Sequence, residues 1–481
     1  MQKKVLSKIK DDQKEEIELF ISTLFKVLML LVGFMQTSCI TFGKHIISYV
    51  LWPTVFLGGI ILLYRLVKIK NYYKSRGFIF LVLFCISFII SALLFRKYGI
   101  YKNIRTFVWI AFQFGILYLY DVGKEKEYYR RQIEIVSNVF LSVTFILTFI
   151  SIFELFIGYS YTVLQENGPH IVHGFTWGRL FGAYWDPNIA SVIVCISIIM
   201  ALNKFKLCKK NTVKILYVLF IILQIIYVVF SDSRTGKLCF IVGITLYSLL
   251  RCIQELMNKH DISIKKKISI TTSIVLITII LTIIVPIGIK RIYNGPIRDL
   301  IAFIQREEPK DGEKKETKNI AIGRGYDISS DITNRRADIW NSVLDILKKE
   351  PIFGVSRNNI IPYVRENIPD TYIINNDQMD FSSMHNLTFD ILASQGFVGL
   401  AIFFTFAGTC IVLLIKNLKG ITQDFNDYFP MLICVIATIV ASTVVMTEII
   451  YVDSPISTVF WIYLSNIIFS CSKNKIDKKE V

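Results

Sequence analysis

Long apolar segments recur along this chain of 481 residues, and they decide its class. A segment needs roughly 20 mostly apolar residues to cross about 30 Å of hydrocarbon. Hydrophobic residues make up 53% of the chain and charged residues only 19%, whereas soluble domains carry about 25% charged residues. Lipid must therefore cover part of the surface, and the sequence predicts an all-α polytopic membrane protein. We expect about twelve transmembrane helices, near residues 18–40, 45–66, 78–95, 104–121, 135–157, 187–203, 213–230, 237–252, 268–288, 386–415, 428–447 and 455–471.

The basic residues between these segments predict an orientation. With twelve spans, most Lys and Arg clusters fall on one side together with both termini, and the positive-inside rule makes that side cytoplasmic. The net charge of +17 then reports topology, and no nucleic-acid partner is expected. One group conflicts with this pattern, because the count places Arg96, Lys97, Lys102 and Arg105 outside. The cytoplasmic clusters lie in residues 3–14, 68–76, 124–131, 204–214, 251–267 and 473–479.

The opposite side carries two shorter segments, 158–186 and 231–236, and one large extracytoplasmic loop near 289–385. Loops this long are usually functional or disordered. Residues 305–330 are charged and indicate a mobile stretch. The chain thus divides into four parts, which are residues 1–134 with spans one to four, 135–288 with spans five to nine, the loop 289–385, and 386–481 with spans ten to twelve.

Residues 331–350 of the loop predict an amphipathic helix. Apolar residues recur there at helical spacing from Ile339 to Leu347. Thr333 or Asn334 can cap its start, and Pro351 ends it. An amphipathic helix with Trp and basic ends suits the membrane interface, and a small capping subdomain is the other interpretation.

Cysteine and histidine patterns give no metal or disulfide site. None of the nine cysteines lies in the long loop, which excludes a disulfide framework there. His170 and His173 form an H-x-x-H pair without a neighbouring Cys or carboxylate ligand, so it is weak as a metal site. Asp311 and Glu313 are the nearest approach to a metal-binding carboxylate pair, and they lie in the charged stretch.

Four sets of polar residues lie at the outer ends of the predicted spans. Burying a polar group there costs free energy unless the group has a partner or a function. The first runs from Arg179 into Asp186, Pro187 and Asn188 at the start of a span. A helix start attracts anions, and the planar guanidinium of an arginine matches phosphate oxygens. The alternative is an ordinary capped helix start beside an interfacial arginine.

The second set is the short turn 231–237, with the sequence SDSRTGK. Its apolar flanks hold Arg234 near the membrane face, where a phosphate-bearing lipid would lie. Alternatively, Asp232 pairs with Arg234. The Gly-Lys pair is not a P-loop, because the upstream glycine is missing.

The third set is Arg335 and Arg336 at the start of the loop helix. Cations at that end oppose the helix dipole. They require a compensating anion, which is either a carboxylate of Asp331 or Asp338 or a bound diphosphate.

The fourth set is His385 and Asn386, where the long loop returns to the membrane. A neutral imidazole can accept a proton near physiological pH. The alternative is a structural histidine.

The order of these sets resembles the O-antigen ligase and polymerase superfamily. The resemblance covers roughly residues 135–415. Its elements, in chain order, are Arg179 with Gly182 running into Asp186-Pro187-Asn188, Ser233-Arg234, Arg336 with Ile339-Trp340, Pro351 to Val355, and His385-Asn386 followed by Gly396 to Leu400.

The resemblance implies a GT-C-like enzyme on the outer face of the cytoplasmic membrane. Its donor would be an undecaprenyl-diphosphate-linked oligosaccharide, and no cofactor or metal is expected. A polymerase extends capsular or O-antigen polysaccharide on the next lipid-linked repeat unit, whereas a ligase moves finished polymer to another acceptor. Chain-length regulator and flippase proteins are the expected partners.

The resemblance also implies roles for individual residues. His385 would be the base that activates the acceptor hydroxyl, and Arg179, Arg234 and Arg336 would stabilise the departing diphosphate. The residues expected to contact substrate are Arg335, Asn386, Asn188 and Trp340. Two rivals from other classes are a flippase of lipid-linked oligosaccharide and a non-catalytic scaffold. Transporters usually show internal repeats and mid-membrane charges, and the sequence shows neither.

Overall fold

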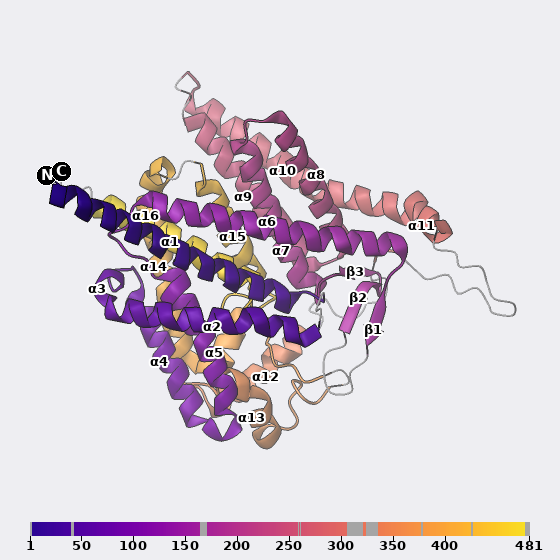
Figure 1. The fold of residues 1–481 in the computed structure, drawn as a ribbon. Coiled ribbons are helices and arrows are strands. Elements are labelled where there is room, and N and C mark those ends of the chain that lie inside the picture. Colours follow the sequence, from indigo (N-terminus) through magenta and orange to yellow (C-terminus); the bar gives the residue numbers. More distant parts are fainter. Residues whose placement is uncertain are drawn as a thin grey trace.

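Helices build almost the whole molecule (Figure 1). The computed structural model describes residues 2–39, 43–163, 171–257, 259, 261–304, 321–323, 335–376, 379–424 and 427–476. Within these ranges, nine helices are long and apolar enough to cross a membrane. They are α1 (Gln2–Thr37), α2 (Gly43–Val67), α6 (Lys126–Ile157), α7 (Pro187–Leu207), α8 (Asn211–Phe230), α9 (Arg234–Met257), α10 (Ile264–Ile292, continuing through η3, Tyr293–Ile297, into α11, Arg298–Ile304), α14 (Leu387–Asp424) and α16 (Pro455–Ile476).

The polytopic helical class is confirmed, but the count of about twelve spans is not. Two further apolar helices are shorter, α4 (Phe78–Leu94) and α15 (Phe429–Ser442). The span expected at 104–121 is divided between α5 (Ile100–Phe112) and a π-helical turn, η2 (Gln113–Tyr118). Polar side chains explain why this segment differs from the expected span. Asn103 and Thr106 of α5 are buried against other parts of the protein and do not face lipid.

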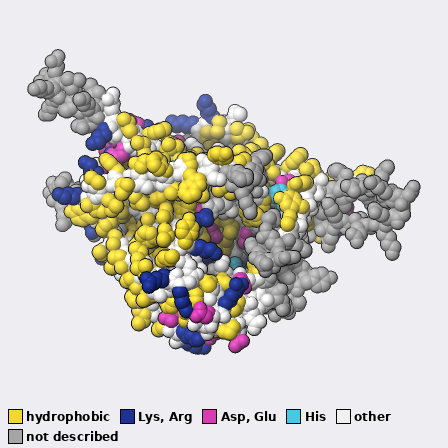
Figure 2. All heavy atoms as spheres, turned by 60° about the horizontal axis from the view of Figure 1, so that its bottom comes forward, with side chains coloured by type: hydrophobic (Ala, Val, Ile, Leu, Met, Phe, Trp, Pro, Cys, Tyr) yellow, Lys and Arg dark blue, Asp and Glu magenta, His cyan; other side chains and the backbone are white. Residues whose placement is uncertain are grey.

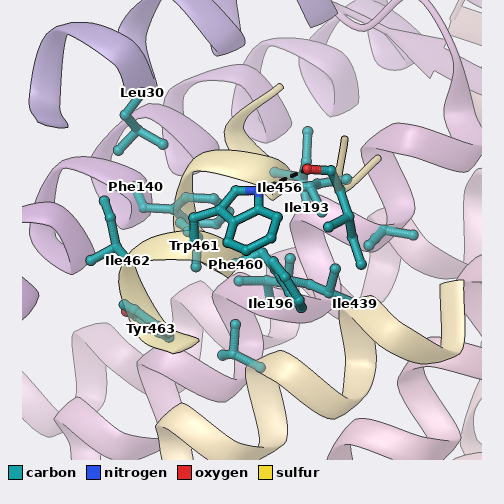
Figure 3. Close-up of a cluster of buried hydrophobic side chains, with 14 of the residues drawn as sticks. Leu30, Phe140, Ile193, Ile196, Ile439, Ile456, Phe460, Trp461, Ile462 and Tyr463 are labelled. Atoms are coloured by element: carbon teal, nitrogen blue, oxygen red, sulfur yellow. Dashed lines mark hydrogen bonds between the residues drawn. The ribbon is translucent and has the colours of Figure 1, made fainter. Parts of the chain in front are cut away.

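The centre of the helical bundle is α16, which protein surrounds on every side. Its Trp461 is fully buried among aliphatic and aromatic side chains from several helices (Figure 3). The indole Nε1 donates to the carbonyl oxygen of Ile449 at 2.9 Å, so the buried N–H is satisfied. By contrast, α10 is almost wholly exposed, which suits a helix that faces lipid.

The first and last parts of the chain share one core. Helix α1 packs on α16, and α4 packs on α14. The beginning of α1 and the end of α16 lie together at one end of the molecule (Figure 1). Residues 1–134 and 386–481 are therefore separate in sequence but not in packing.

Residues 161–182 form a small sheet, which departs from the all-α prediction. The strands β1 (Tyr161–Val163), β2 (Ile171–Thr176) and β3 (Arg179–Gly182) are antiparallel in the order β1-β2-β3. Glycine makes this possible at two points. Gly178 has φ 70° in the turn between β2 and β3, and a Cβ on Gly182 would approach Ser151 of α6 to 2.1 Å. The sheet therefore packs closely on the end of α6.

We call residues 335–386 the capping subdomain. It contains α12 (Arg336–Lys349), η4 (Arg357–Asn359) and α13 (Ile360–Asn367). The predicted loop helix is α12, and it ends before Pro351 as expected, whereas Thr333 and Asn334 lie outside the described residues. Its apolar face does not lie in the membrane interface. Ile339, Val343 and Ile346 are buried in a second hydrophobic core with α13 and the start of α14.

The turn between α4 and α5 packs on this subdomain. It contains η1 (Arg96–Tyr98), and a short helix α3 (Ile69–Tyr72) lies earlier in the chain. The rings of Phe95 and Tyr98 lie edge-on to Tyr363 at 5.5 and 5.6 Å, and Lys97 pairs with Glu366 at 2.7 Å. The basic group near residue 97 therefore lies at the same end as the capping subdomain, where the span count puts it.

Helix α14 is broken at Gly396, where φ is 61° and ψ is −161°. The backbone N–H groups of Phe397 and Val398 turn outward and donate to the carbonyl oxygens of Pro351 and Ile352, at 2.9 and 3.2 Å. A Cβ at Gly396 would meet the Ile352 oxygen at 2.4 Å. The break thus docks the capping subdomain onto α14 through its backbone.

Candidate active site

Arg179 and Asn188 meet where the small sheet joins α7. Asp186 caps α7 by accepting from the backbone N–H of Asn188 at 2.7 Å, and Pro187 occupies the first turn. The buried Arg179 donates through Nε to the Ser231 carbonyl at 2.8 Å and through Nη2 to Asn188 Oδ1 at 2.9 Å. The alternative interpretation of this set, a capped helix start, is confirmed, and Arg179 also joins the sheet to the turn after α8.

The turn after α8 completes this group. The hydroxyl of Ser233 donates to Asn188 Oδ1 at 3.0 Å, so the first and second predicted sets are in contact. Asp232 has φ 42° and pairs with Lys237 at 2.7 Å and with Lys290 at 3.2 Å. Burial alone would raise the pKa of Asp232, but these two lysines outweigh it and hold the pKa below its usual value. Arg234 begins α9 and is exposed.

Arg336 and Arg335 have different surroundings at the start of α12. Arg335 takes φ 62° just before the helix, and its Nη1 donates to the Tyr372 hydroxyl at 3.5 Å. Arg336 is close enough to His385 to lower the pKa of the imidazole. The geometry therefore favours Arg336 over Arg335 as the residue that acts at the histidine.

Trp340 holds α12 against the start of α14. Its Nε1 donates to the Met384 carbonyl at 3.1 Å, and its ring stacks on Phe389 at 5.2 Å. Both contacts flank His385 in sequence. Trp340 lies about one helical turn after Arg336, so its contacts hold this first part of α12 against the residues around His385.

His385 occupies an unusual backbone conformation, with φ 49°. Non-glycine residues in this region are strained and concentrate at functional sites. Burial lowers the pKa of the imidazole from its ordinary 6.5, and the charges of Arg336 and Arg357 lower it further, against the opposing effect of Asp390 and Asp186. At neutral pH the ring is therefore uncharged, and it can accept a proton.

Asn386 has a structural role in the helix start. Its Oδ1 accepts from the backbone N–H groups of Thr388 and Phe389 at 2.9 and 3.2 Å, and its Nδ2 donates to the Val444 carbonyl at 2.9 Å. This is N-cap geometry for α14. These contacts are with the backbone of α14 and of residue 444, and the expected contact of Asn386 with substrate stays a prediction.

Asp390 is an organising residue that the sequence reasoning missed. Its carboxylate is fully buried and accepts from Arg357 Nη1 at 2.8 Å, from the Ser383 hydroxyl at 3.2 Å and from the Met384 N–H at 3.1 Å. Thr447 also donates to it. A carboxylate in the first turn of an apolar span was the available signal.

Glu448 is a second missed residue, in the loop between α15 and α16. Burial raises the pKa of its carboxyl to about 8, and the nearby charges of Asp186 and Asp390 add to the effect. Burial also raises the pKa of Asp453, in the same loop, to about 6. Glu448 is the one charged residue between positions 428 and 452, which is a signal in the sequence itself.

These observations define two neighbouring groups. Arg179, Asn188 and Ser233 are joined by hydrogen bonds. Arg336, Trp340 and His385 lie together at the junction of α12 and α14. Asp186 links them, because it caps α7 beside the first group and acts on the pKa of His385 in the second.

His173 is the member of the histidine pair that the structure describes. His173 forms a buried pair with Glu154, Nε2 to Oε1 at 2.7 Å, and its ring stacks on Tyr161. His170, Asp311 and Glu313 lie outside the described residues. Across the part of the chain that is described, no three His, Cys, Asp or Glu side chains are placed to share a metal ion.

The fold and the site define a polytopic helical membrane protein with a polar, arginine- and carboxylate-rich centre at one end of its spans. Residues 218–404 match the family described as O-antigen ligase, which confirms the predicted superfamily resemblance. The matched segment contains Arg234, Arg336 and His385, whereas Arg179 and Glu448 lie outside it.

A curated relative is also similar. It is an uncharacterised protein of Haemophilus influenzae (strain ATCC 51907 / DSM 11121 / KW20 / Rd), 27% identical over 238 residues, which are 48% of this chain and 51% of that protein. The chain therefore spans about half the length of this relative.

Proposed function

We propose that the protein polymerises undecaprenyl-diphosphate-linked oligosaccharide repeat units into capsular or O-antigen polysaccharide, on the outer face of the cytoplasmic membrane. One observation carries the proposal. His385 has a positive φ and a lowered pKa, and it lies near enough to the cation of Arg336 and to the carboxylates of Asp390 and Asp186 for all three to influence that pKa, within a chain whose residues 218–404 match the O-antigen ligase family.

The proposed reaction is a direct displacement at the anomeric carbon of the donor. A hydroxyl oxygen of the acceptor sugar forms the new bond to that carbon, and His385 takes the hydroxyl proton. The bond to the lipid diphosphate breaks, and the diphosphate leaves with the electron pair. A positioned base of this kind contributes about 10²–10⁴-fold to the rate.

Charge on both sides of the histidine supports these roles. The imidazolium formed by proton transfer would be stabilised by the nearby carboxylates of Asp390 and Asp186, which already raise the proton affinity of the ring. Arg336, together with Arg234 and Arg179, would stabilise the negative charge of the departing diphosphate. Asn188 and Trp340 would then act on substrate indirectly, by holding Arg179 and α12 in place.

The ligase reaction is the second candidate, because the matching family is described as O-antigen ligase. The chemistry at His385 would be the same, and only the acceptor would change. The two activities therefore differ in product and not in the site residues.

The test is glycan analysis in a host that supplies lipid-linked repeat units but lacks its own polymerase. The wild-type protein should give a polymer ladder. His385→Ala and Arg336→Ala should each abolish the ladder at unchanged protein abundance. Arg298→Ala is the matched control, because Arg298 pairs with the exposed Asp299 on α11 and should leave the ladder intact.

Results of the glycan analysis other than those expected would each support a different function. A wild-type ladder from well-expressed His385→Ala would overturn the catalytic role. Transfer of preformed polymer to a second lipid, without elongation, would identify a ligase. Translocation of repeat units without any new glycosidic bond would identify a flippase.

A further inference from the structure

A cleft of about 770 Å³ opens between the start of α5 and the capping subdomain. This volume lies within the roughly 300–1,000 Å³ of typical ligand pockets. Figure 2 shows a face on which charged side chains gather within a largely apolar surface. The lining residues that matter here are Tyr101, Lys102, Arg357, Asn358, Arg365 and Tyr451.

The walls of this cleft are fixed by a buried asparagine. Asn103 is 1% exposed, and its Nδ2 donates to Asn359 Oδ1 at 2.9 Å while its Oδ1 accepts from the Ser356 hydroxyl at 2.9 Å. Asn358 adds a bond from Nδ2 to the Thr106 hydroxyl at 2.8 Å. These contacts join α5 to the capping subdomain, so the cleft is a preformed feature of the fold.

The lining carries positive charge and exposed aromatic surface. Lys102, Arg357 and Arg365 line it, and among the residues that the structure describes no Asp or Glu does. Arg357 and Arg365 are already paired, with Asp390 and Asp380. Lys102 is exposed and forms no ion pair with any residue of the described ranges. Beside it, the Tyr101 side chain is 81% exposed.

Two lining residues connect the cleft to the catalytic centre. Arg357 contacts Asp390 and acts on the pKa of His385. Tyr451 accepts a hydrogen bond from Gln395, which follows Asp390 on α14. A molecule in the cleft would therefore contact Arg357, which pairs directly with Asp390.

We propose that this cleft binds an acidic stretch of glycan, in which sugar units carry carboxylate or phosphate groups, adjoining the unit that reacts at His385. The assignment rests on the proposed polymerase function. Tyrosine rings present flat faces that pack on the apolar faces of sugars, amide and guanidinium groups bind hydroxyls, and the exposed ammonium group of Lys102 matches an acidic substituent. The cleft thus selects substrate by charge.

Binding to the full chain in lipid nanodiscs tests the proposal. The probe is a tetrasaccharide of alternating glucuronic acid and N-acetylglucosamine, compared with its carboxyl-reduced form by isothermal titration. Lys102→Gln and Tyr101→Ala should each weaken binding of the acidic probe roughly tenfold, the usual effect of losing one charged or aromatic contact. The matched controls are Lys70→Gln and Tyr73→Ala, two exposed residues near α3 that should leave binding unchanged.

The outcomes separate this cleft from the catalytic proposal. Equal affinity for the acidic and reduced probes, or an unchanged affinity in Lys102→Gln, would overturn the acidic-glycan site. Displacement of the probe by phosphatidylglycerol in the nanodisc, with the same dependence on Lys102, would assign the cleft to a lipid headgroup and overturn the glycan assignment. The cleft and the catalytic histidine can be tested separately. His385→Ala should bind the probe with the same affinity as the wild-type protein. If the wild-type protein binds the probe through Lys102 but makes no polymer, the catalytic proposal is wrong and the assignment of the cleft still holds.

Discussion

Nη1 of Arg357 lies 2.8 Å from Oδ1 of Asp390, and this ion pair joins the capping subdomain to the first turn of α14. The Asp390 side chain is fully buried, and Arg357 is 12% exposed. Asp390 raises the pKa of the His385 imidazole and Arg357 lowers it, so this ion pair also influences the pKa of the candidate base.

Breaking this pair on one side should destabilise the protein strongly. Arg357→Met leaves a buried carboxylate without its partner, which typically costs about 3–5 kcal/mol. The free energy of unfolding, measured by titration with a denaturing detergent, should fall by that order. Lys348→Ala is the control, because it removes an exposed pair with Asp345 worth less than about 0.5 kcal/mol. Equal losses in the two variants would contradict the structural role.

The pH dependence of activity should report His385. The pKa of the imidazole lies below 6.5, so the acidic limb of kcat/KM should fall below pH 6.5, where protonation removes the base. Arg336→Gln should be inactive, so the His385 ring is titrated in it by NMR, and its pKa should be higher than in the wild type because the variant removes a charge that lowers it. Asp390→Asn removes a charge that raises this pKa, so the limb should move to lower pH. Shifts of the two variants in the same direction would rule out His385 as the group observed.

Glu448 should make stability fall as pH rises. Its pKa is about 8 in the folded protein, against an ordinary value of 4.5, so the folded state binds more protons between these values. Stability contributed by the neutral carboxyl is therefore lost as pH increases through this window. Glu448→Gln should flatten the dependence of thermal stability on pH from about 4.5 to about 8. An unchanged slope in that variant would show that Glu448 ionises freely.

The break in α14 should be intolerant of a side chain. Gly396→Ala places a Cβ 2.4 Å from the Ile352 oxygen at a positive φ, so we expect a loss of about 1–3 kcal/mol or more. Gly408→Ala lies in the same helix with nothing within 4 Å of its Cβ, and it should leave stability unchanged or slightly higher. Thermal unfolding of the two purified variants compares them directly. Similar melting temperatures would show that the break adapts to alanine.

Metal removal should not stop the reaction. The proposed stabilisation of the diphosphate uses arginine cations, so activity should survive dialysis against EDTA. Polymer formation by purified protein on lipid-linked repeat units, before and after chelation, is the measurement. If chelation abolishes activity and a divalent ion restores it, the proposal that arginine side chains alone stabilise the diphosphate is wrong.

Local sequence patterns predicted a good part of this fold. Apolar length identified the membrane-spanning helices, and the spacing from Ile339 to Leu347 identified α12. Pro187 and Asp186 marked the start of α7 correctly. These features depend on residues close in sequence, so local chemistry is sufficient to predict them.

Longer-range features could not be predicted in this way. The small sheet depends on glycine conformations and on close packing against Ser151 of α6. The apolar face of α12 suits lipid or protein equally well, and only packing against α13 and α14 decides between them. Asn386 has a side chain that can cap a helix or bind sugar, and its neighbours determine the first role.

The sequence by itself determined that lipid surrounds this protein and that its polar sets stand at the ends of the spans, because hydropathy and charge are properties of each segment. The tertiary structure alone decided which groups share the site. Asp186 and Glu448 are 262 positions apart in the chain, yet the charge of Asp186 contributes to the raised pKa of the Glu448 carboxyl. Burial and proximity set the protonation of His385 and Glu448, and these arise only when distant helices pack together.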